Sequence, residues 1–274
     1  NMYSAGGVGD AGLGLFFRAF AQTDLHTTMN TPLQTRRVGS HEDVRQFFDG
    51  IATTYRECHG AADKLLGYRL RLIQSLLPPA TCGSLLEIGC GTGLHLFALA
   101  ERFAQAYGTD LSPGMIAQAE SLRAQHPCKA HITFKVDQAE TLVSIDTGAI
   151  DLVLCVGAFE HMLDKPAVLR QVRRVLKPDG AFICLTPHGD YVWYTHLARW
   201  LGLSTRHLST DRFLTATEWV AALKDAGLQP DRLGYWTFIP RGDMPRTAAA
   251  ALMLLDGLGR LFIWPSLRGG LHCR

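Results

Sequence analysis

The sequence predicts an α/β fold in which a mostly parallel sheet carries helices on both faces. Short apolar segments alternate along the chain with segments of helical periodicity, and this alternation is typical of parallel strands joined by crossover helices. A glycine-rich turn at residues 89–93 directly follows the first apolar segment of that series, as in doubly wound folds that bind a ligand at the carboxyl ends of their strands. At 274 residues, the chain is long enough for one large domain with insertions.

The expected elements follow one another in the order that such a fold requires. Apolar residues at helical spacing predict a helix within 41–60, and a second helix over 63–77 is ended by two prolines. The next expected strands are 84–88, 105–109, 131–136, 150–156 and 180–185, and the expected helices between them are 93–103, 113–125 and 165–176. The last expected elements are a helix over 215–228 with Thr217 as N-cap and Gly227 just beyond its end, a strand at 231–239, an apolar helix at 246–264 and a strand at 269–274.

Residues 1–78 are interpreted as an N-terminal arm and helices that cover the ligand site, and residues 79–274 as the core. The core is expected to carry cap insertions at about 187–214, which is dense in aromatic residues and histidine, and at about 241–267, which is strongly apolar. The aromatic insertion either packs on the core or forms a lid that excludes water. The sequence leaves open whether the helix at 246–264 is buried, faces a lipophilic substrate, forms a homodimer surface or contacts a membrane surface.

Charge and cysteine content narrow the class of partner and the compartment. The chain has 27 Lys and Arg against 25 Asp and Glu, a net charge of +2, so no electrostatic footprint for nucleic acid stands out. The seven cysteines form no CxxC pair and no disulfide-like spacing. With no signal peptide at the start of the sequence and no apolar run of spanning length, we expect a cytoplasmic protein with reduced cysteines.

The glycine-rich turn contains an acid as well as glycines. The motif is E-x-G-x-G-x-G, formed by Glu87, Gly89, Gly91 and Gly93. Glycines let a ligand touch the backbone, and the start of the following helix adds N–H donors. The dinucleotide fingerprint needs a small residue at the position of Leu94, so an NAD-dependent dehydrogenase is disfavoured. The acid beside the loop favours a ligand that carries positive charge, such as an ammonium or sulfonium group.

Acidic residues also follow the next two strands. Asp110 comes at the end of the second strand of the series, where a carboxylate can accept hydrogen bonds from both hydroxyls of a ribose. Asp137 follows the third strand, where it can accept a hydrogen bond from an exocyclic amine while the backbone of Gln138 meets a ring nitrogen. The fourth strand leads into a polar pair, Glu160 and His161. The favoured ligand therefore combines a ribose, an amine-bearing ring and a positive charge.

Taken together, these residues resemble the class I S-adenosylmethionine-dependent methyltransferases. The resemblance covers about 45–240 and is strongest over 85–185. The stretch FFDGIATTY and the Glu160–His161 pair are most similar to the small-molecule methyltransferases of ubiquinone and menaquinone biosynthesis. The resemblance implies a Rossmann-like, doubly wound sheet of seven strands, the last of them antiparallel. It also implies S-adenosyl-L-methionine as the cofactor and S-adenosyl-L-homocysteine as its product.

The resemblance further implies which side chains hold this cofactor. The acid–glycine loop would hold the methionine part beneath Tyr55, and Asp110 would bind the ribose. Met115 would pack near the adenine, and Asp137 with Gln138 would hold the adenine edge. Four further positions beside these motifs are expected to line the same site: Cys90, Leu111, Ala139 and Val156.

Methyl transfer from a sulfonium needs alignment and exclusion of water, and it needs a base only when the acceptor is a neutral hydroxyl. A histidine can take such a proton at neutral pH, and we expect His161 first and His188, just after the fifth strand, second. Some quinone O-methyltransferases of the resembling group bind a divalent metal through E-x-x-E-H. Gly157 replaces the first acid here, so no metal site is expected.

The leading functional prediction is methyl transfer to oxygen or carbon of a small, apolar or aromatic molecule. Methylation of a protein or RNA is the alternative enzyme function, which the near-neutral charge and the absence of an N/D-P-P-Y/F motif after the fourth strand disfavour. A regulatory subunit that binds S-adenosylmethionine without catalysis is the alternative from another class. The acceptor pocket is expected from 40–60, 157–165, 187–214 and 236–264, but these segments predict neither the acceptor nor the oligomeric state.

Overall fold

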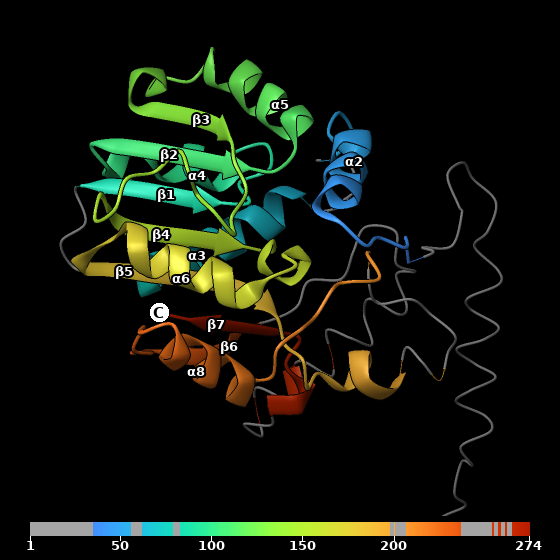
Figure 1. Ribbon diagram of the computed structural model, residues 1–274. Helices are drawn as coiled ribbons and strands as arrows, with labels where there is room; N and C mark the ends of the chain where they lie inside the picture. The colour runs from blue at the N-terminus through green and yellow to red at the C-terminus, as the bar shows by residue number, and fades with distance from the viewer. Residues whose placement is uncertain are drawn as a thin grey trace, which may run out of the picture.

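The computed structural model describes residues 35–55, 62–78, 83–197, 200, 207–236, 254, 257, 258, 261 and 265–274. Within them, seven strands form one sheet in the order β3-β2-β1-β4-β5-β7-β6, which confirms the predicted fold class (Figure 1). The strands are β1 (Ser84–Ile88), β2 (Gln105–Asp110), β3 (Ile132–Val136), β4 (Ile150–Val156), β5 (Leu176–Pro187), β6 (Leu233–Trp236) and β7 (Gly270–Cys273). All pairs among β1 to β5 are parallel, whereas β7 runs antiparallel to both β5 and β6.

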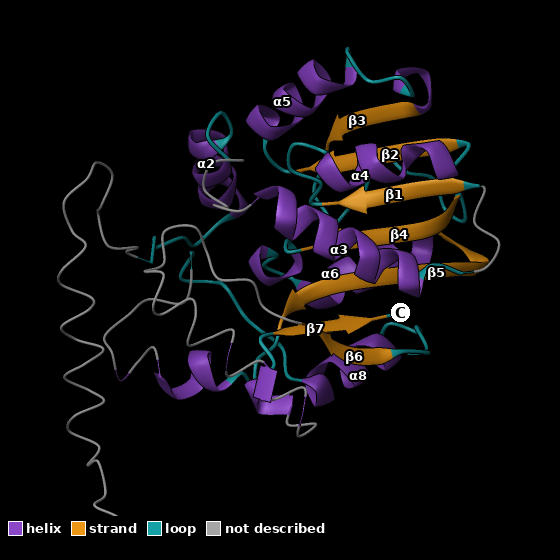
Figure 2. Cartoon of the chain, turned by 180° about the vertical axis from the view of Figure 1, so that it is seen from behind, coloured by secondary structure: helices purple, strands orange, loops and turns teal. Residues whose placement is uncertain are grey.

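Helices cover both faces of this sheet, as a doubly wound fold requires. One face packs against α3 (Ala62–Leu76), α4 (Leu94–Leu99) and α5 (Pro113–Arg123), and the other against α6 (Lys165–Val175) and α8 (Ala216–Asp225) (Figures 1 and 2). Helix α2 (His41–Ile51) lies beyond the sheet, at the end to which the parallel strands point. The shorter turns are η2 (Ala100–Arg102), η3 (Lys129–His131), η4 (Phe159–His161), η6 (Pro265–Leu267) and the π-helical η5 (Trp193–Leu197).

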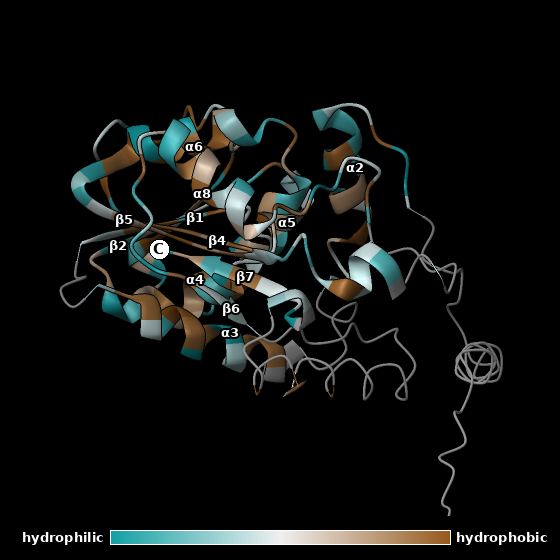
Figure 3. Ribbon diagram, turned by 90° about the horizontal axis from the view of Figure 1, so that it is seen from below, coloured by the Kyte–Doolittle hydropathy of each residue, from teal (hydrophilic) through white to brown (hydrophobic). Residues whose placement is uncertain are grey.

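The central strands are buried on both sides because helices cover both faces, and their sequences are therefore nearly continuous apolar runs. Consecutive residues of β1 enter opposite cores. Leu85 packs with α3 and α4, whereas Leu86 packs with α6, and both side chains are fully buried. Figure 3 shows the hydrophobic strands between the two helix layers. This arrangement leaves the polar groups at the carboxyl ends of the strands as the place where a ligand can bind.

Helix α8 begins at a different residue from the predicted one. Thr215, and not Thr217, is the N-cap: its side chain accepts a hydrogen bond from the backbone N–H of Glu218, and the Glu218 side chain accepts one from the N–H of Thr215. This reciprocal pair is a capping box, which satisfies two N–H groups at once and so outcompetes the cap at Thr217. Gly227 has a φ of +75° just beyond the helix, as predicted.

Three other elements differ from the expected boundaries by more than two residues. The helix expected within 41–60 ends at Ile51, and 52–55 form turns; the β-branched Thr53 and Thr54 there have low helix propensity. The helix expected over 93–103 is the short α4 followed by the 3₁₀ turn η2. Strand β5 begins at Leu176 rather than at 180, because Leu176 already pairs with Ile150 before the register shifts.

Some expectations lie outside the described residues. These are the arm before residue 35, the chain at 56–61, the end of the strand expected at 231–239 and most of the helix expected at 246–264. Within that last range, Leu254, Leu258 and Leu261 are helical, and all three side chains are exposed. No helix among the described residues combines the length and the apolar character needed to cross a membrane.

Candidate functional site

A cavity lies at the carboxyl ends of β1, β2 and β4, and residues of α2 form part of its wall. It holds about 670 Å³ of space, including the part that is open to solvent. The chain leaves β1 for β2 on one side and later returns to β4 on the other, so the cavity lies where the strand order reverses. Open α/β sheets bind their ligands at such points.

The structure brings nine predicted site residues to this cavity: Tyr55, Gly89, Gly91, Asp110, Leu111, Met115, Asp137, Ala139 and His161. Six other predicted site residues do not line it: Glu87, Cys90, Gly93, Gln138, Val156 and His188. Six lining residues were not singled out from the sequence: His41, Val44, Phe48, Glu140, Ala158 and Met162. They come from the segments 40–60 and 157–165, where an acceptor pocket was expected, and from the loop after β3.

The glycine loop has a backbone that only glycine adopts readily. Gly89 has a φ of +63°, and a methyl group there would lie 2.5 Å from Cβ of Ala158. Gly91 has a φ of +52°, and a methyl group there would point toward the Tyr55 ring, 3.6 Å from its Cε1 atom. Without side chains at these two positions, the loop forms a cradle that exposes backbone to the cavity. Gly93 is the N-cap of α4 and does not line the cavity.

Asp110 at the end of β2 is oriented by the same loop. Its Oδ2 atom accepts a hydrogen bond from the backbone N–H of Gly91 at 2.8 Å, and its Oδ1 atom accepts one from the N–H of Ser112 at 2.9 Å. Each oxygen keeps a lone pair for a ligand hydroxyl. Burial raises the pKa of Asp110 to about 6, although these two N–H donors oppose the shift.

Asp137 after β3 is held by backbone donors of its own loop. Oδ1 accepts from the N–H of Gln138, and Oδ2 accepts from the N–H of Ser144, both at 2.8 Å. The backbone N–H of Asp137 in turn donates to the carbonyl of Asp110 at 3.0 Å, so the backbone fixes the separation of the two acidic residues. Gln138 does not line the cavity, but its side chain contacts His41, which does, with 3.0 Å between the two Nε2 atoms.

Glu87 is buried beneath the loop rather than in the cavity wall. Its Oε1 atom lies 3.0 Å from Nδ1 of His95, the second residue of α4. Its Oε2 atom is buried and has no hydrogen-bond partner among the described residues. The acid that the sequence places beside the loop is therefore present, but part of its hydrogen-bonding capacity goes to a histidine.

A partly buried cation next to the cavity was not predicted from the sequence. Arg69 of α3 lies close to Gly157, where a methyl group would be 3.4 Å from Nη2, and its guanidinium is stacked 5.8 Å from the Trp236 ring centroid. Burial lowers the pKa of Arg69, and its Nε atom has no partner among the described residues. One signal was available: Arg69 lies four residues from both Leu65 and Ile73, which are buried, so a charge falls on the apolar face of the helix.

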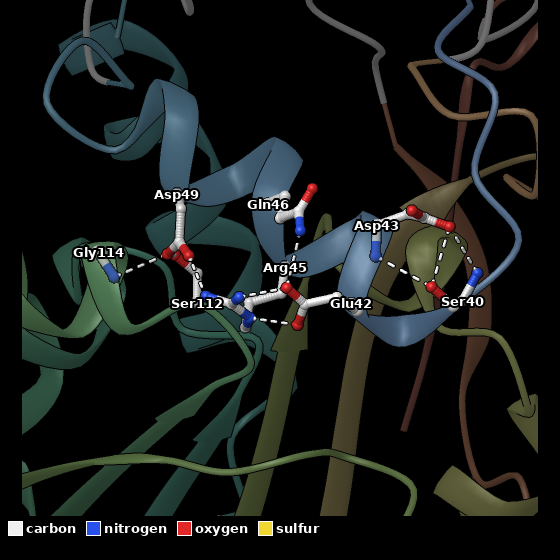
Figure 4. A network of polar contacts seen from close by, with 8 residues as sticks. All are labelled: Ser40, Glu42, Asp43, Arg45, Gln46, Asp49, Ser112 and Gly114. Carbon is white, nitrogen blue, oxygen red and sulfur yellow. Dashed lines mark hydrogen bonds and ion pairs between the residues drawn. The ribbon is translucent and has the colours of Figure 1, made fainter.

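Helix α2 closes one side of the cavity with His41, Val44 and Phe48, which share one helical face. Its carboxyl-terminal end is attached to the core by Asp49, whose Oδ1 atom accepts hydrogen bonds from the Ser112 hydroxyl and the Gly114 N–H (Figure 4).

The amino-terminal end of α2 is fixed separately. Ser40 and Asp43 form a capping box there, and Arg45 bridges Glu42 and Asp49 along the helix (Figure 4). Because Asp49 also contacts Ser112 and Gly114, this network links α2 to the start of α5.

His161 at the end of η4 forms a close pair with a carboxylate. Its Nδ1 atom lies 2.7 Å from Oδ1 of Asp211, whose side chain is fully buried. Burial lowers the pKa of His161, but the hydrogen bond to Asp211 and the nearby charge of Glu160 outweigh it, and the net pKa is raised. Burial raises the pKa of Asp211, but hydrogen bonds from His161 and from the backbone hold it below its usual range. The sequence predicted His161 but not its partner, which lies fifty residues away.

His188 lies outside the cavity. Its ring is buried, with Nδ1 3.1 Å from the carbonyl oxygen of Arg268 and the ring centroid 4.9 Å from that of Tyr235. Burial lowers its pKa. The aromatic rings near it in the expected lid pack on one another, with Tyr191 against Tyr194, and do not line the cavity.

The residues before His161 do not assemble a metal site. Gly157 has a φ of +63° and provides no ligand, and Glu160 is buried, with the Thr186 hydroxyl 3.4 Å from its Oε2 atom. In the part of the chain that the structure describes, no three His, Cys, Asp or Glu side chains come together as a metal ion would need.

Comparison with known proteins identifies relatives of this chain. Residues 86–184 match the family model described as a methyltransferase domain. The chain is 30% identical over 212 residues to the ubiquinone biosynthesis O-methyltransferase of Xanthomonas campestris pv. campestris (strain B100), across 73% of this chain and 86% of that protein. It is 27% identical over 213 residues to the protein of the same name from Xanthomonas axonopodis pv. citri (strain 306), with the same shares covered.

A solved structure shares the fold. Geranyl diphosphate methyltransferase, in complex with GPP and sinefungin, superposes with a TM-score of 0.61 over 85% of this chain and 97% of that one. The two sequences are 14% identical, so this likeness concerns the architecture and not the reaction.

Proposed function

Because the chain belongs to the class I S-adenosylmethionine-dependent methyltransferases, we propose that it methylates a hydroxyl group of a small aromatic molecule, with His161 as the general base. One observation carries this proposal. One cavity is lined by two groups of residues: the glycine loop, Asp110 and Asp137 form the first group, and His161 and apolar side chains form the second. Cofactor and acceptor can therefore meet in one space that is partly shielded from water.

The residues of the first group fit S-adenosylmethionine. The cradle at Gly89 and Gly91 leaves room for its methionine part, and the Asp110 carboxylate keeps lone pairs for the two ribose hydroxyls. Asp137 is held in place to accept a hydrogen bond from the adenine amine. Arg69, whose Nε atom is buried and has no partner among the described residues, would meet the carboxylate of the methionine part. When bound, the cofactor supplies a methyl group on a positively charged sulfur.

The second group suits a flat, apolar acceptor that carries a hydroxyl group. Val44 and Phe48 of α2 and Met162 after η4 belong to this group. The Phe48 ring packs edge-on against the His161 ring, with 5.3 Å between the centroids. An aromatic acceptor between these side chains would be held by dispersion and aromatic contacts.

His161 provides the proton acceptor in the second group. Its Nδ1 atom is engaged by Asp211, and its Nε2 atom has no partner among the described residues, while the ring lines the cavity. A phenol has a pKa near 10, so at neutral pH it must lose a proton to become a good nucleophile. His161 would take that proton at Nε2 as the oxygen attacks the methyl group. The name O-methyltransferase of the curated relatives supports oxygen as the acceptor atom.

The test is methyl transfer from labelled S-adenosylmethionine to phenol, catechol and an alkylated catechol, with the products identified by mass spectrometry. We expect an O-methylated product, and we expect His161→Asn to lower its rate by about 10²-fold or more, the usual contribution of a general base. The matched control is His131→Asn, since His131 is exposed in η3 and remote from the cavity lining. A C-methylated product, or full activity of His161→Asn, would contradict the proposal.

A further inference from the structure

We propose that Asp211 is a positioning residue: it fixes the tautomer and orientation of His161 in which Nδ1 carries the hydrogen and Nε2 is free for the proton of the acceptor. This inference rests on the proposed role of His161 as a base, and it adds a second residue to that machinery. Neither the glycine loop nor the strand-end acids point to it, because Asp211 lies near the end of the aromatic insertion at 187–214.

The hydrogen bonds of the Asp211 carboxylate determine which ring nitrogen of His161 carries the hydrogen. Oδ1 lies 2.7 Å from Nδ1 of His161, and Oδ2 accepts from the backbone N–H groups of His207 and Leu208, both at 2.9 Å. Two amide donors on one oxygen prevent the carboxylate from rotating. A carboxylate that is ionised can only accept, so the shared hydrogen must be on Nδ1 of the histidine. The other ring nitrogen is then the one with a lone pair, and it belongs to the ring that lines the cavity.

The loop that carries Asp211 is itself fixed to the site. The N–H of Arg212 donates to the carbonyl of Glu160, the residue before the histidine, at 3.2 Å. On its other side, the N–H of Arg36 donates to the carbonyl of His207 at 2.9 Å, and Leu208 is fully buried. The acid and the base are therefore joined through backbone as well as side chains, so their separation is set by the fold.

The surroundings of the pair favour this role over a purely structural one. Asp211 is 1% exposed, and its charge is balanced by the imidazolium that forms when the base takes a proton. The other ionisable groups that face His161 are Glu160 and Lys165, on η4 and at the start of α6, and His207, whose ring centroid lies 5.8 Å away. Lys165 is turned to the backbone, where its Nζ donates to the carbonyls of Glu160 and Met162. The Glu160 carboxylate accepts from the Thr186 hydroxyl, and Asp211 is the carboxylate in direct contact with the ring.

Asp211→Asn tests the idea because an amide changes the chemistry and keeps the shape. In this variant, the amide oxygen would face the two backbone N–H donors, and the amide NH₂ group would face Nδ1 of the histidine. Nδ1 would then have to accept, which moves the ring hydrogen to Nε2 and removes the lone pair from the acceptor side. Asp211→Ala removes the contact altogether and is the second variant. Asp179→Asn, which changes an exposed acid near the start of β5, is the matched control.

The first readout is the ring tautomer of His161, measured by nitrogen NMR on histidine-labelled protein above the pH at which the ring is protonated. We expect the Nδ1–H form in the wild type and in Asp179→Asn, and the Nε2–H form in Asp211→Asn. An Nε2–H tautomer in the wild type, or an unchanged Nδ1–H tautomer in Asp211→Asn, would overturn the proposal.

The second readout is the rate of methyl transfer to catechol and to 4-nitrocatechol at pH 8, with S-adenosylmethionine affinity measured by calorimetry in every variant. We expect Asp211→Asn to keep the affinity, to lose about 10²-fold or more in rate with catechol, and to lose much less with the nitro compound, whose hydroxyl is already ionised. Equal losses for both acceptors would overturn the base-positioning role. If the wild type binds the cofactor but methylates neither compound, the proposed function fails, and the tautomer measurement still decides the role of Asp211.

Discussion

Asp49 of α2 accepts a hydrogen bond from the hydroxyl of Ser112 at 2.5 Å, while the backbone N–H of the same serine donates to Asp110. One residue therefore contacts both the helix that covers the cavity and the carboxylate proposed to bind the ribose. Ser112 is also the N-cap of α5, because its hydroxyl accepts from the N–H of Met115 at 3.0 Å. Displacement of α2 should consequently disturb the cofactor side of the cavity.

This relationship predicts the effect of Asp49→Ala. The substitution removes the acceptor for Ser112 and Gly114 and leaves two polar groups without their partner. We expect S-adenosylmethionine to bind about three- to tenfold more weakly, in line with the loss of about 1 kcal/mol for a hydrogen bond. Amide hydrogen exchange in α2 should also become faster, and mass spectrometry would measure it.

The matched control for Asp49→Ala is Glu42→Ala. Glu42 belongs to the same helix, but it contacts Arg45 and Gln46 rather than the core (Figure 4). If both variants weaken binding equally, the effect comes from the stability of α2 itself and not from its attachment at Ser112.

The raised pKa of Asp110 predicts how cofactor binding depends on pH. Burial raises this pKa to about 6 in the ligand-free protein, and the ionised form is the better acceptor for two ribose hydroxyls. Below pH 6, binding must therefore displace a proton. We expect an affinity that is constant above about pH 7 and falls by up to tenfold per pH unit below pH 6. Calorimetric titrations at several pH values would measure it, and an affinity that is flat down to pH 5 would contradict this role of the carboxylate.

Arg69 should discriminate between ligands with and without a carboxylate. Arg69→Leu removes the cation but keeps an apolar stem on the buried face of α3. We expect it to weaken S-adenosylhomocysteine binding by about tenfold or more, since a charge-assisted hydrogen bond contributes about 1.5–3 kcal/mol. Binding of methylthioadenosine, which lacks the carboxylate, should change little. Equal weakening for the two ligands would mean that Arg69 supports the cavity wall and does not meet the carboxylate.

The two threonines at the start of α8 give a test of stability. Thr215→Ala removes the side chain that caps the helix and should cost about 1 kcal/mol of unfolding free energy. Thr217→Ala, at the position predicted from the sequence, should change stability by no more than a few tenths of that. Denaturant unfolding would compare the stability of the two variants. A larger loss of unfolding free energy for Thr217→Ala would show that Thr215 is not the N-cap of α8.

The parts of the site that follow strand ends could be predicted from the sequence. Gly89, Gly91, Asp110 and Asp137 all come directly after short apolar strands, and parallel strands bring their carboxyl ends to one edge of the sheet. Local pattern and a simple topological rule were sufficient for these residues. The same alternation predicted the parallel sheet itself, and the resemblance to class I methyltransferases implied the antiparallel last strand, β7, which lies between β5 and β6.

The residues that were missed depend on packing between distant segments. Asp211 meets His161 only because the end of the aromatic insertion folds back on η4, and nothing in its local sequence marks that contact. Val44 and Phe48 lie in the segment 40–60 that was expected to contribute to the acceptor pocket, but the helical pattern does not say which of its side chains line the cavity. Arg69 is the intermediate case, because a charge on the buried face of α3 was visible in the periodicity.

The most direct test of the account is calorimetric titration of wild-type protein and Asp110→Ala with S-adenosylmethionine, S-adenosylhomocysteine and NAD. We expect micromolar binding of the first two ligands to the wild type and none of NAD. We also expect at least tenfold weaker binding by Asp110→Ala, which corresponds to about 1.4 kcal/mol or more. Unchanged affinity in Asp110→Ala, or binding of NAD in place of S-adenosylmethionine, would contradict the assignment of the cavity and of everything derived from it.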